Sequence, residues 1–479
     1  MIKKIDEDNP EFYDRIIAET DNGEQYTYHD LKLFSDKLGQ KTVSRSTVFV
    51  LCEHCIGELF GVLSFLRNKV VMYLLDSKLP QERINALLAE YTPNYMYVPE
   101  KKKENYKGFH LVFEEYGMAL LKNDMVQREL VKNDRLAFFL STSGSTGTSK
   151  LVRLAYDNYE AVVEREICIS HISPDSVTAT FLPIQFAYGL GIILSHVSVG
   201  AKIIITKMSV TQNRFWKLCD EKKITYFYGV PYMYENICNL GIEDYLKRFR
   251  VISVAGGKLK MHVSLKCTRV AADNHVLFIN EYGQTEASCM SFQIKSENGS
   301  YHPEENIGES NCDGKMYLLD ADKKVITEQN VRGELMYEGK TAAMGYCRTN
   351  KEIDAEDSWC KVIDTGDIAI INDLGKIEIV GRAKRFIKIY GKRYSLDHIE
   401  HIMNQEIQKG QVVTSGCDGM LVIFTDTEEN IESCKKYIHS KYGISESNFQ
   451  VEYLKEFPLN DNGKIAYAEL LKYVNEKFA

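Results

Sequence analysis

Two hydrophobic patterns alternate along the first 135 residues. Residues 28–38 space their apolar side chains three and four positions apart, which predicts an amphipathic helix. Residues 48–51 form a short, continuous apolar run, which is typical of a buried strand. Further elements follow in turn: a helix over 57–66, a strand over 70–74, a helix that opens at 79–83 and a strand over 95–98. This alternation predicts a layered α/β fold with a largely parallel sheet.

The same rhythm continues to about residue 305 and then changes. Apolar runs predict further strands, several of which end in proline or glycine, and the run at 276–280 predicts a strand that ends at Asn280. From residue 306 the chain consists of short predicted strands and glycine-bearing turns. We therefore expect a large N-terminal domain over residues 1–383, built of layered α/β subdomains and a small β-barrel-like part. A small α+β domain over 384–479 follows.

Composition excludes several classes of protein. Of 479 residues, 44% are apolar and 26% are charged, which are ordinary globular values. The net charge of −8 argues against binding nucleic acid or an anionic membrane surface. The sequence has no signal-peptide pattern, no membrane-spanning apolar run and no regular framework among its twelve cysteines. We expect a cytoplasmic protein with reduced thiols and no membrane insertion.

The stretch at 141–150 carries the clearest candidate chemistry. Nine consecutive residues are Gly, Ser or Thr, and Lys150 closes the run. Such a loop lets backbone N–H groups surround an anion while hydroxyls and the lysine add donors and charge, so it suits a polyphosphate. A Walker A loop is excluded, because two residues separate Gly147 from Lys150 and Leu151 follows the lysine. The loop lies between two predicted strands.

Four residues farther along the chain suit a nucleotide site, although each also fits an ordinary structural role. Glu286 offers a carboxylate for Mg²⁺, and Tyr282 offers a flat face for adenine. Asp367 could accept hydrogen bonds from ribose hydroxyls or simply close an Asx turn. Lys464 follows a predicted turn at 460–463 that would hold it on a loop; taken alone, it is an ordinary solvated lysine.

Five motifs, in order, resemble those of the adenylate-forming superfamily of acyl-CoA synthetases, peptide-synthetase adenylation domains and luciferases. The loop at 141–150 is similar to that family's phosphate loop, and residues 280–286 to its Y-G-x-T-E motif. Residues 365–367 match T-G-D, 381–391 match G-R-x-x-x-x-I-K-x-x-G, and 462–465 match N-G-K-I. One such motif is weak evidence, whereas five in order are specific.

The resemblance implies ATP and Mg²⁺ as cofactors and gives several residues a role. Glu286 becomes the metal ligand, and the implied catalytic residues are Lys464, Thr146 and Glu286. Lys464 would contact the acid's carboxylate and the α-phosphate, and Lys384 falls at the hinge of a mobile C-terminal domain. The positions implied to bind ATP are Thr142, Ser143, Gly144, Ser145, Thr146, Gly147, Lys150, Asn280, Tyr282, Gly283, Thr285, Asp367, Arg382 and Lys464.

The implied reaction has two steps. A carboxylate attacks the α-phosphorus of ATP to give an acyl-adenylate and pyrophosphate; the small domain then turns about Lys384, and a thiol displaces AMP. The thiol belongs to coenzyme A or to the phosphopantetheine of a separate carrier protein, and the sequence leaves that choice open. The other partner is a small-molecule carboxylic acid, whose identity, like the oligomeric state, the sequence does not give.

The residues after Pro183 bear on the acid. Amino-acid activators of this superfamily typically carry Asp after the Phe that corresponds to Phe186, whereas this chain has Ala187. Burying an ammonium group without a counter-charge is costly, so an ordinary α-amino acid is disfavoured and an aliphatic, aryl or hydroxy acid is preferred. By position, the candidate acid pocket comprises Phe186, Ala187, Val230, Ala255 and Gly256.

Other readings remain as alternatives. One is a stand-alone amino-acid-activating ligase for a carrier protein, and another is a catalytically silent nucleotide-binding relative. The silent relative would be expected to have lost Lys464, Glu286 or Asp367, and all three are present. Cys52 and Cys55 form a C-x-x-C pair without a second pair of zinc ligands, so we expect buried or unreactive thiols. The hydrolase motif G-x-S-x-G does not occur.

Overall fold

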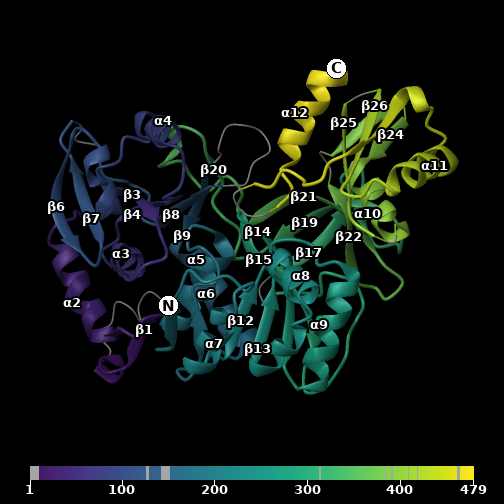
Figure 1. Ribbon diagram of the computed structural model, residues 1–479. Helices are drawn as coiled ribbons and strands as arrows, with labels where there is room; N and C mark the ends of the chain where they lie inside the picture. The colour runs from purple at the N-terminus through teal and green to yellow at the C-terminus, as the bar shows by residue number, and fades with distance from the viewer. Residues whose placement is uncertain are drawn as a thin grey trace. The chain divides into compact units, whose positions relative to one another are not determined.

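The computed structural model describes residues 10–125, 129–141, 151–311, 314–382, 385–389, 392–407, 409–417, 419–460 and 464–478. These residues form two compact units, each of which is described separately below (Figure 1). The first unit holds the described residues of Met1–Ser143, Ser149–Lys315 and Tyr337–Ile363, and the second those of Met316–Met336 and Asp364–Ala479. The predicted domain boundary between residues 383 and 384 stays a prediction, because Lys384 lies outside the described residues.

An eight-stranded mixed sheet forms one part of the first unit. In spatial order its strands are β20 (Tyr346–Cys347), β9 (Leu151–Ala155), β8 (Leu136–Ser141), β4 (Val71–Asp76), β3 (Thr47–Cys52), β5 (Tyr95–Pro99), β7 (Met118–Asn123) and β6 (Phe109–Glu115). The four strands from β8 to β5 are parallel, as the alternating hydrophobic pattern predicted, and antiparallel strands flank them.

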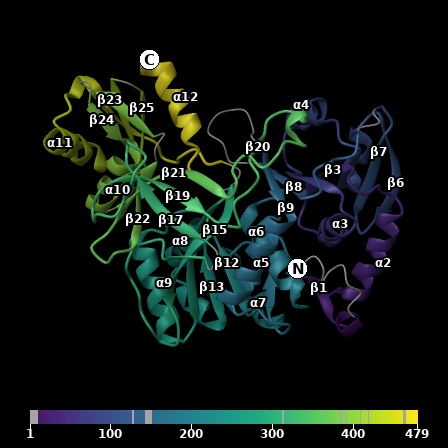
Figure 2. The same ribbon diagram turned by 180° about the vertical axis from the view of Figure 1, so that it is seen from behind.

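Helices cover both faces of this sheet because successive strand residues point to opposite sides. Val48 and Val50 of β3 face a core shared with α2 (Tyr28–Gly39), α3 (Ile56–Arg67), α5 (Tyr156–Ser170) and α6 (Ala187–Ser198). Phe49 and Leu51 face a second core with α4 (Gln81–Tyr91). Both ribbon views show α3 and α4 on opposite sides of β3 and β4 (Figures 1 and 2).

Two further sheets complete the first unit. One contains β10 (Val177–Ala179), β11 (Lys202–Ile205), β1 (Ile16–Thr20) and β2 (Gln25–Thr27). The other contains β12 (Tyr226–Gly229), β13 (Val251–Val254), β14 (Leu277–Gln284), β15 (Ala287–Ser296) and β16 (Glu309–Ser310). One face of the latter packs on α7 (Asn213–Glu221), α8 (Pro231–Asn239) and α9 (Met261–Asp273), and the other on α5 and α6. The sequence prediction for β14 was too short, because antiparallel pairing with β15 extends the strand from Asn280 to Gln284.

A five-stranded sheet corresponds to the part expected to be barrel-like. Its strands are β18 (Val325–Ile326), β17 (Lys315–Leu319), β19 (Gly333–Glu338), β21 (Val362–Ile371) and β22 (Ile377–Arg382). In the described chain this sheet is open, with β18 and β22 at its two edges.

The C-terminal part of the second unit is α+β, as predicted. It contains β23 (Phe386–Ile389), β24 (Lys392–Ser395), β25 (Val412–Cys417), β26 (Met420–Thr425), β27 (Phe449–Tyr453), α10 (Leu396–Glu406), α11 (Asn430–Tyr442) and α12 (Tyr467–Phe478). The sheet β25–β26–β27 packs on α10 and α11 with one face and on α12 with the other.

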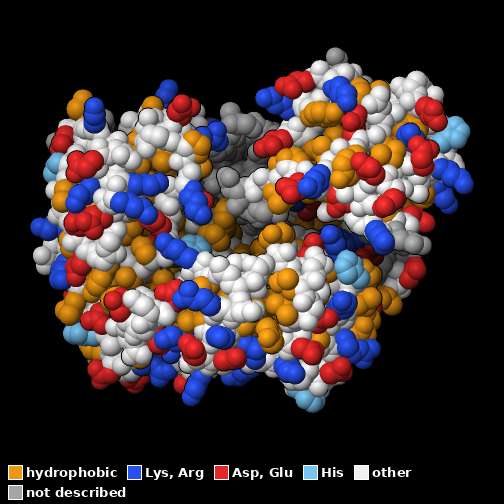
Figure 3. All heavy atoms as spheres, in the orientation of Figure 1, with side chains coloured by type: hydrophobic (Ala, Val, Ile, Leu, Met, Phe, Trp, Pro, Cys, Tyr) orange, Lys and Arg blue, Asp and Glu red, His pale blue; other side chains and the backbone are white. Residues whose placement is uncertain are grey.

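Charged side chains of both signs are interspersed over the face drawn in Figure 3. Among the described helices, none is long and apolar enough to cross a membrane.

Candidate functional site

Three parallel strands of the first unit bring candidate residues to one sheet edge. Gly229, Val254 and Asn280 are register neighbours on β12, β13 and β14. Because the strands run parallel, Val230 and Ala255 leave the sheet at the same edge, where β14 continues beyond Asn280 in its pairing with β15. Three predicted positions of the acid pocket, Val230, Ala255 and Gly256, therefore lie beside the predicted ATP-binding residue Asn280.

The start of α6 joins the same edge. Phe186 is the N-cap residue of α6, and Ala187 is its first helical residue. Tyr188, the next residue, donates a hydrogen bond from Oη to Ser253 Oγ on β13 at 2.9 Å. This bond ties the helix start to β13, so the structure brings all five predicted acid-pocket residues to one region of the first unit.

The motif at 280–286 forms the hairpin between β14 and β15. Asn280, Tyr282 and Gly283 belong to β14, whereas Thr285 and Glu286 lie in the connection to β15. A Cβ on Gly283 would lie 2.4 Å from the backbone nitrogen of Cys289, so the close approach of the two strands requires glycine here. Tyr282 is half-buried.

Glu286 is held at this hairpin by two contacts. Its Oε1 accepts a hydrogen bond from Tyr346 Oη at 2.8 Å, and its backbone oxygen accepts one from the Ala343 N–H at 2.9 Å. The side chain is half-buried. No group of three or more His, Cys, Asp or Glu side chains that could hold a metal occurs among the described residues. The oriented carboxylate of Glu286 is an oxygen ligand of the kind that Mg²⁺ takes alongside phosphates.

Directly beneath the sheet edge is a buried charge cluster that the sequence did not reveal. Glu281 on β14 accepts a hydrogen bond from Ser253 Oγ at 2.6 Å and pairs with Arg165 Nη2 at 3.1 Å. Arg165 also pairs with Glu166 at 3.1 Å and contacts Cys289. Desolvation, and then the charge of Glu281, raises the pKa of the Glu166 carboxyl above its usual range. The cluster joins α5 to β14 behind the candidate acid pocket.

In the second unit, Asp367 and Arg382 lie opposite each other on β21 and β22. Arg382 Nε and Asp367 Oδ1 are 2.9 Å apart. Thr365 donates to the Leu335 carbonyl oxygen at 2.8 Å, and the Asp367 N–H donates to Thr365 Oγ1 at 3.1 Å. Gly366 has a φ of 71°, in the left-handed region that favours glycine. The T-G-D motif is therefore a kinked strand segment that presents Asp367 beside Arg382.

Lys464 lies on a loop closed by hydrogen bonds. The Asn460 N–H donates to the Lys464 carbonyl at 2.7 Å, and the Lys464 N–H donates to Asn460 Oδ1 at 3.0 Å. Leu459 and Ile465 pair as an antiparallel bridge. Desolvation, and then the positive charge of Arg382, lowers the pKa of Lys464. The structure thus pairs two predicted ATP-binding residues of the second unit, Asp367 and Arg382, and the charge of Arg382 contributes to the lowered pKa of a third, Lys464.

Several predicted residues lie outside the described part of the chain. These are the hinge residue Lys384 and the phosphate loop, with Thr142, Ser143, Gly144, Ser145, Thr146, Gly147 and Lys150. The strands that the loop joins are described: β8 and β9 are antiparallel neighbours, with Ser141 opposite Leu151. The prediction that the loop connects two strands is confirmed.

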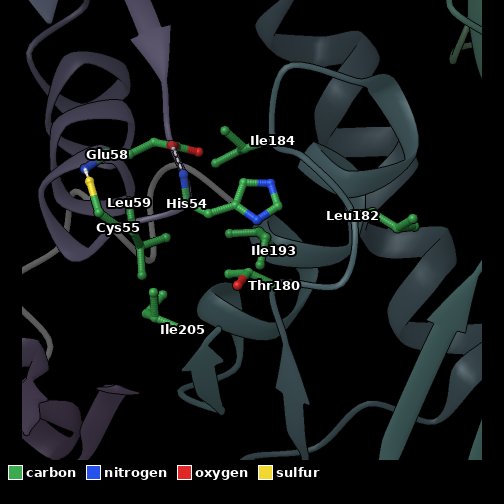
Figure 4. Close-up of a pocket in the computed structure, with 9 residues that line it drawn as sticks. All are labelled: His54, Cys55, Glu58, Leu59, Thr180, Leu182, Ile184, Ile193 and Ile205. Atoms are coloured by element: carbon green, nitrogen blue, oxygen red, sulfur yellow. Dashed lines mark hydrogen bonds between the residues drawn. The ribbon is translucent and has the colours of Figure 1, made fainter. Parts of the chain in front are cut away.

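A small pocket lies at the start of α3, and Cys55 of the C-x-x-C pair is one of the residues that line it (Figure 4). Cys52 is buried, and Cys55 Sγ, the N-cap of α3, accepts from the Glu58 N–H at 3.4 Å. Burial raises the pKa of the Cys55 thiol to about 11 and that of the Glu58 carboxyl to about 7. Cys52 is thus a buried thiol, as predicted, and Cys55 is a half-buried thiol whose raised pKa makes it a poor nucleophile.

A family model described as AMP-binding enzyme matches residues 5–347. The chain belongs to the AMP-binding enzyme family. The resemblance inferred from the five motifs is thereby confirmed.

Curated relatives of this AMP-binding chain include much longer proteins. Gramicidin S synthase 2 of Brevibacillus brevis is 23% identical over 483 residues, which cover 94% of this chain and 10% of the synthase. Bacitracin synthase 3 of Bacillus licheniformis is 24% identical over 452 residues, which cover 90% of this chain and 7% of the synthase. The chain thus spans a tenth or less of the length of these two relatives.

Solved structures share the fold of this AMP-binding chain over nearly its whole length. ATP-bound MatB from Rhodopseudomonas palustris has a TM-score of 0.83 at 16% identity, with 100% of both chains covered. MenE, the o-succinylbenzoate CoA synthetase of Bacillus subtilis, in complex with its acyl-adenylate intermediate has a TM-score of 0.76 at 17% identity, with 98% of this chain and 97% of MenE covered.

Proposed function

We propose that this AMP-binding protein joins a carboxylic acid to a thiol at the expense of ATP. The acid attacks the α-phosphorus of ATP, pyrophosphate leaves, and the thiol then displaces AMP from the acyl-adenylate. The observation that carries the proposal is the ion pair of Asp367 and Arg382, which come from two separate motifs; the charge of Arg382 also contributes to the lowered pKa of Lys464, from a third motif. A carboxylate paired with an arginine suits a ribose hydroxyl next to a phosphate, and Lys464 would add positive charge where negative charge develops on that phosphate.

The residues of the first unit fit the other parts of the same reaction. The edge formed by β12, β13 and β14 offers Tyr282 for adenine, with Val230 and Ala255 beside it for the acid. Glu286, oriented by Tyr346, would hold Mg²⁺, whose charge would help to neutralise the departing phosphates. The phosphate loop would hold the β- and γ-phosphates through its backbone N–H groups. Lys384 would be the hinge about which the smaller part of the chain turns between the two half-reactions.

The charge cluster supports an acid without an α-ammonium group. Glu281 lies at the edge of the candidate pocket, but it is buried and paired with Arg165. A carboxylate already neutralised in this way is a poor counter-charge for a substrate ammonium, and Ala187 supplies none. We therefore favour an aliphatic, aryl or hydroxy acid. The thiol is that of coenzyme A or of a carrier protein's phosphopantetheine.

ATP–pyrophosphate exchange with a panel of acids tests the proposal. At least one acid should support exchange, and Lys464→Ala should reduce its rate by about 10²–10³-fold, because a preorganised positive charge at the reacting phosphate is lost. Thioester formation from supplied acyl-adenylate should persist in the same variant. Lys472→Ala, which removes an exposed lysine of α12, is the control and should leave both half-reactions unchanged. Absence of exchange with every acid, together with absence of ATP binding, would refute the proposal.

A further inference from the structure

Tyr467, which immediately follows the loop carrying Lys464, has a polar role beyond packing. It is the first residue of α12 and is half-buried against the apolar residues of β25 and β26. Its ring lies 3.6 Å from the guanidinium carbon of Arg385, and its Oη donates to Glu400 Oε1 at 2.5 Å. Packing alone would need neither contact, since leucine or phenylalanine fills such a position. The contacts of Tyr467 with Arg385 and Glu400 therefore indicate a role other than packing.

Arg385 lies at the centre of a half-buried network in the second unit. Its guanidinium contacts Asp397, lies 3.3 Å from Glu400 Oε2 and donates to the Thr414 carbonyl oxygen at 2.5 Å. Glu400 also accepts from the Thr414 N–H at 2.8 Å. Although desolvation opposes charge, Glu400 and Asp397 raise the pKa of Arg385. The ring of Tyr467 thus stacks on the guanidinium group of Arg385, which stays charged and is held in place by its partners.

The same network reaches two predicted ATP-binding residues. The Arg382 N–H donates to Asp397 Oδ2 at 2.8 Å, and the Arg382 side chain pairs with Asp367. At the other end, three residue steps separate Tyr467 from Lys464, and three residues span at most about 11 Å. The Ala466 N–H donates to the Pro458 carbonyl oxygen at 2.8 Å, and this hydrogen bond further restricts the positions that Lys464 can take. Fixing Tyr467 therefore limits where Lys464 can be.

We propose that Tyr467 is a positioning residue: by stacking on Arg385 and donating to Glu400, it holds residues 464–466 so that Lys464 meets the reacting α-phosphate. The inference rests on the proposed function. It assigns Tyr467 to acyl-adenylate formation alone, because the second half-reaction proceeds without Lys464. In the sequence Arg385 directly follows the predicted hinge residue Lys384, so the contacts of Tyr467 would join the segment of Lys464 to the point from which the domain would turn.

Kinetics of the two half-reactions test the inference. Tyr467→Leu removes both contacts and should lower the rate constant for pyrophosphate exchange by about 10–100-fold, the cost of misplacing a catalytic group by roughly 1 Å. Thioester formation from supplied acyl-adenylate should keep its wild-type rate. Tyr467→Phe keeps the stack and loses one hydrogen bond, so a loss of about three- to tenfold is expected. Equal losses in both half-reactions would overturn the inference.

Tyr473 supplies a matched control on the same helix. Its Oη lies 3.4 Å from Glu452 Oε2, and its ring contacts Phe424. Tyr473→Leu and Tyr473→Phe should leave exchange unchanged, and a loss like that of the Tyr467 variants would overturn the inference.

Hydrogen exchange of the Lys464 and Ala466 amides provides a test without substrate. Exchange should accelerate in Tyr467→Leu and remain slow in Tyr473→Leu, and identical protection in both variants would overturn the inference. If no acid supports pyrophosphate exchange in the wild-type protein and ATP does not bind, the proposed function fails, and amide exchange still decides whether Tyr467 holds Lys464 and Ala466 in place.

Discussion

Each unit contains a cluster in which an arginine lies between two carboxyl groups, Arg165 in the first and Arg385 in the second, and the two clusters differ in what else they hold. Arg165 pairs with Glu166 and Glu281, and its side chain is 5% exposed. Arg385 pairs with Asp397 and Glu400, and its side chain is 18% exposed. The first cluster joins a helix and a strand of one packed core. The second also supports Tyr467 and, through it, the loop of Lys464.

The difference shows that the same charges can serve two purposes. Around Arg165, each partner lies on a regular element that packing already fixes, so the cluster adds a neutralised wall behind the candidate acid pocket. Around Arg385, the added partners lie near chain segments that must be placed precisely and, in the proposed mechanism, must move. Removing the arginine should therefore cost stability in the first unit and positioning in the second.

Arg165→Leu should have the largest effect on stability. It leaves Glu281 and the Glu166 site buried without their cation, which typically costs about 3–5 kcal/mol of unfolding free energy. Both tryptophans, Trp216 and Trp359, belong to the first unit. Urea unfolding followed by tryptophan emission therefore reports on that unit. A loss below about 1 kcal/mol would mean that the cluster is not desolvated as described.

Arg385→Leu should have a smaller effect on stability, about 1–3 kcal/mol, because other donors remain for its partners. Glu400 keeps Tyr467 Oη and the Thr414 N–H, and Asp397 keeps the Arg382 N–H. The tryptophan transition should stay where it is, whereas amide exchange in α10 and β25 should accelerate. A shift of the tryptophan transition as large as that of Arg165→Leu would erase the distinction between the clusters.

Regular features of the fold could be predicted from the sequence, because they depend on short-range patterns. The runs 136–140 and 276–280 indicated strands, and strands β3, β4, β5 and β8 are parallel as expected. The residues at the ends of β12, β13 and β14 could also be predicted as neighbours, because parallel strands share a carboxyl edge.

The clusters could not be predicted in the same way, because their partners are far apart in sequence. Arg165 and Glu281 are separated by 116 positions, and no periodic pattern links them. One local signal existed: Arg165 lies three residues after Val162 and four before Ile169, so it shares a helix face with apolar side chains. A charge on such a face indicates a buried partner, but identifying Glu281 required the three-dimensional structure.

Glu166→Gln should have the smallest effect, a change in how the stability of the first unit depends on pH. Because the pKa of Glu166 is raised in the folded protein, the unfolded chain releases this proton first as pH rises above the ordinary value of 4.5. The wild-type first unit should therefore lose stability as pH increases through this range, by at most about 1.4 kcal/mol per pH unit from this group. Glutamine does not titrate, so the free energy of unfolding of the variant should rise relative to that of the wild type between pH 5 and roughly pH 8.

Urea unfolding at several pH values, followed by tryptophan emission, measures this gain. Glu164→Gln, an exposed change two residues earlier on α5, is the matched control and should follow the wild-type profile. If Glu166→Gln instead loses stability steadily with rising pH relative to wild type, then Glu166 is ionised beside Arg165. The first cluster would then carry two buried negative charges against one positive charge, and its description as a neutral wall would be wrong.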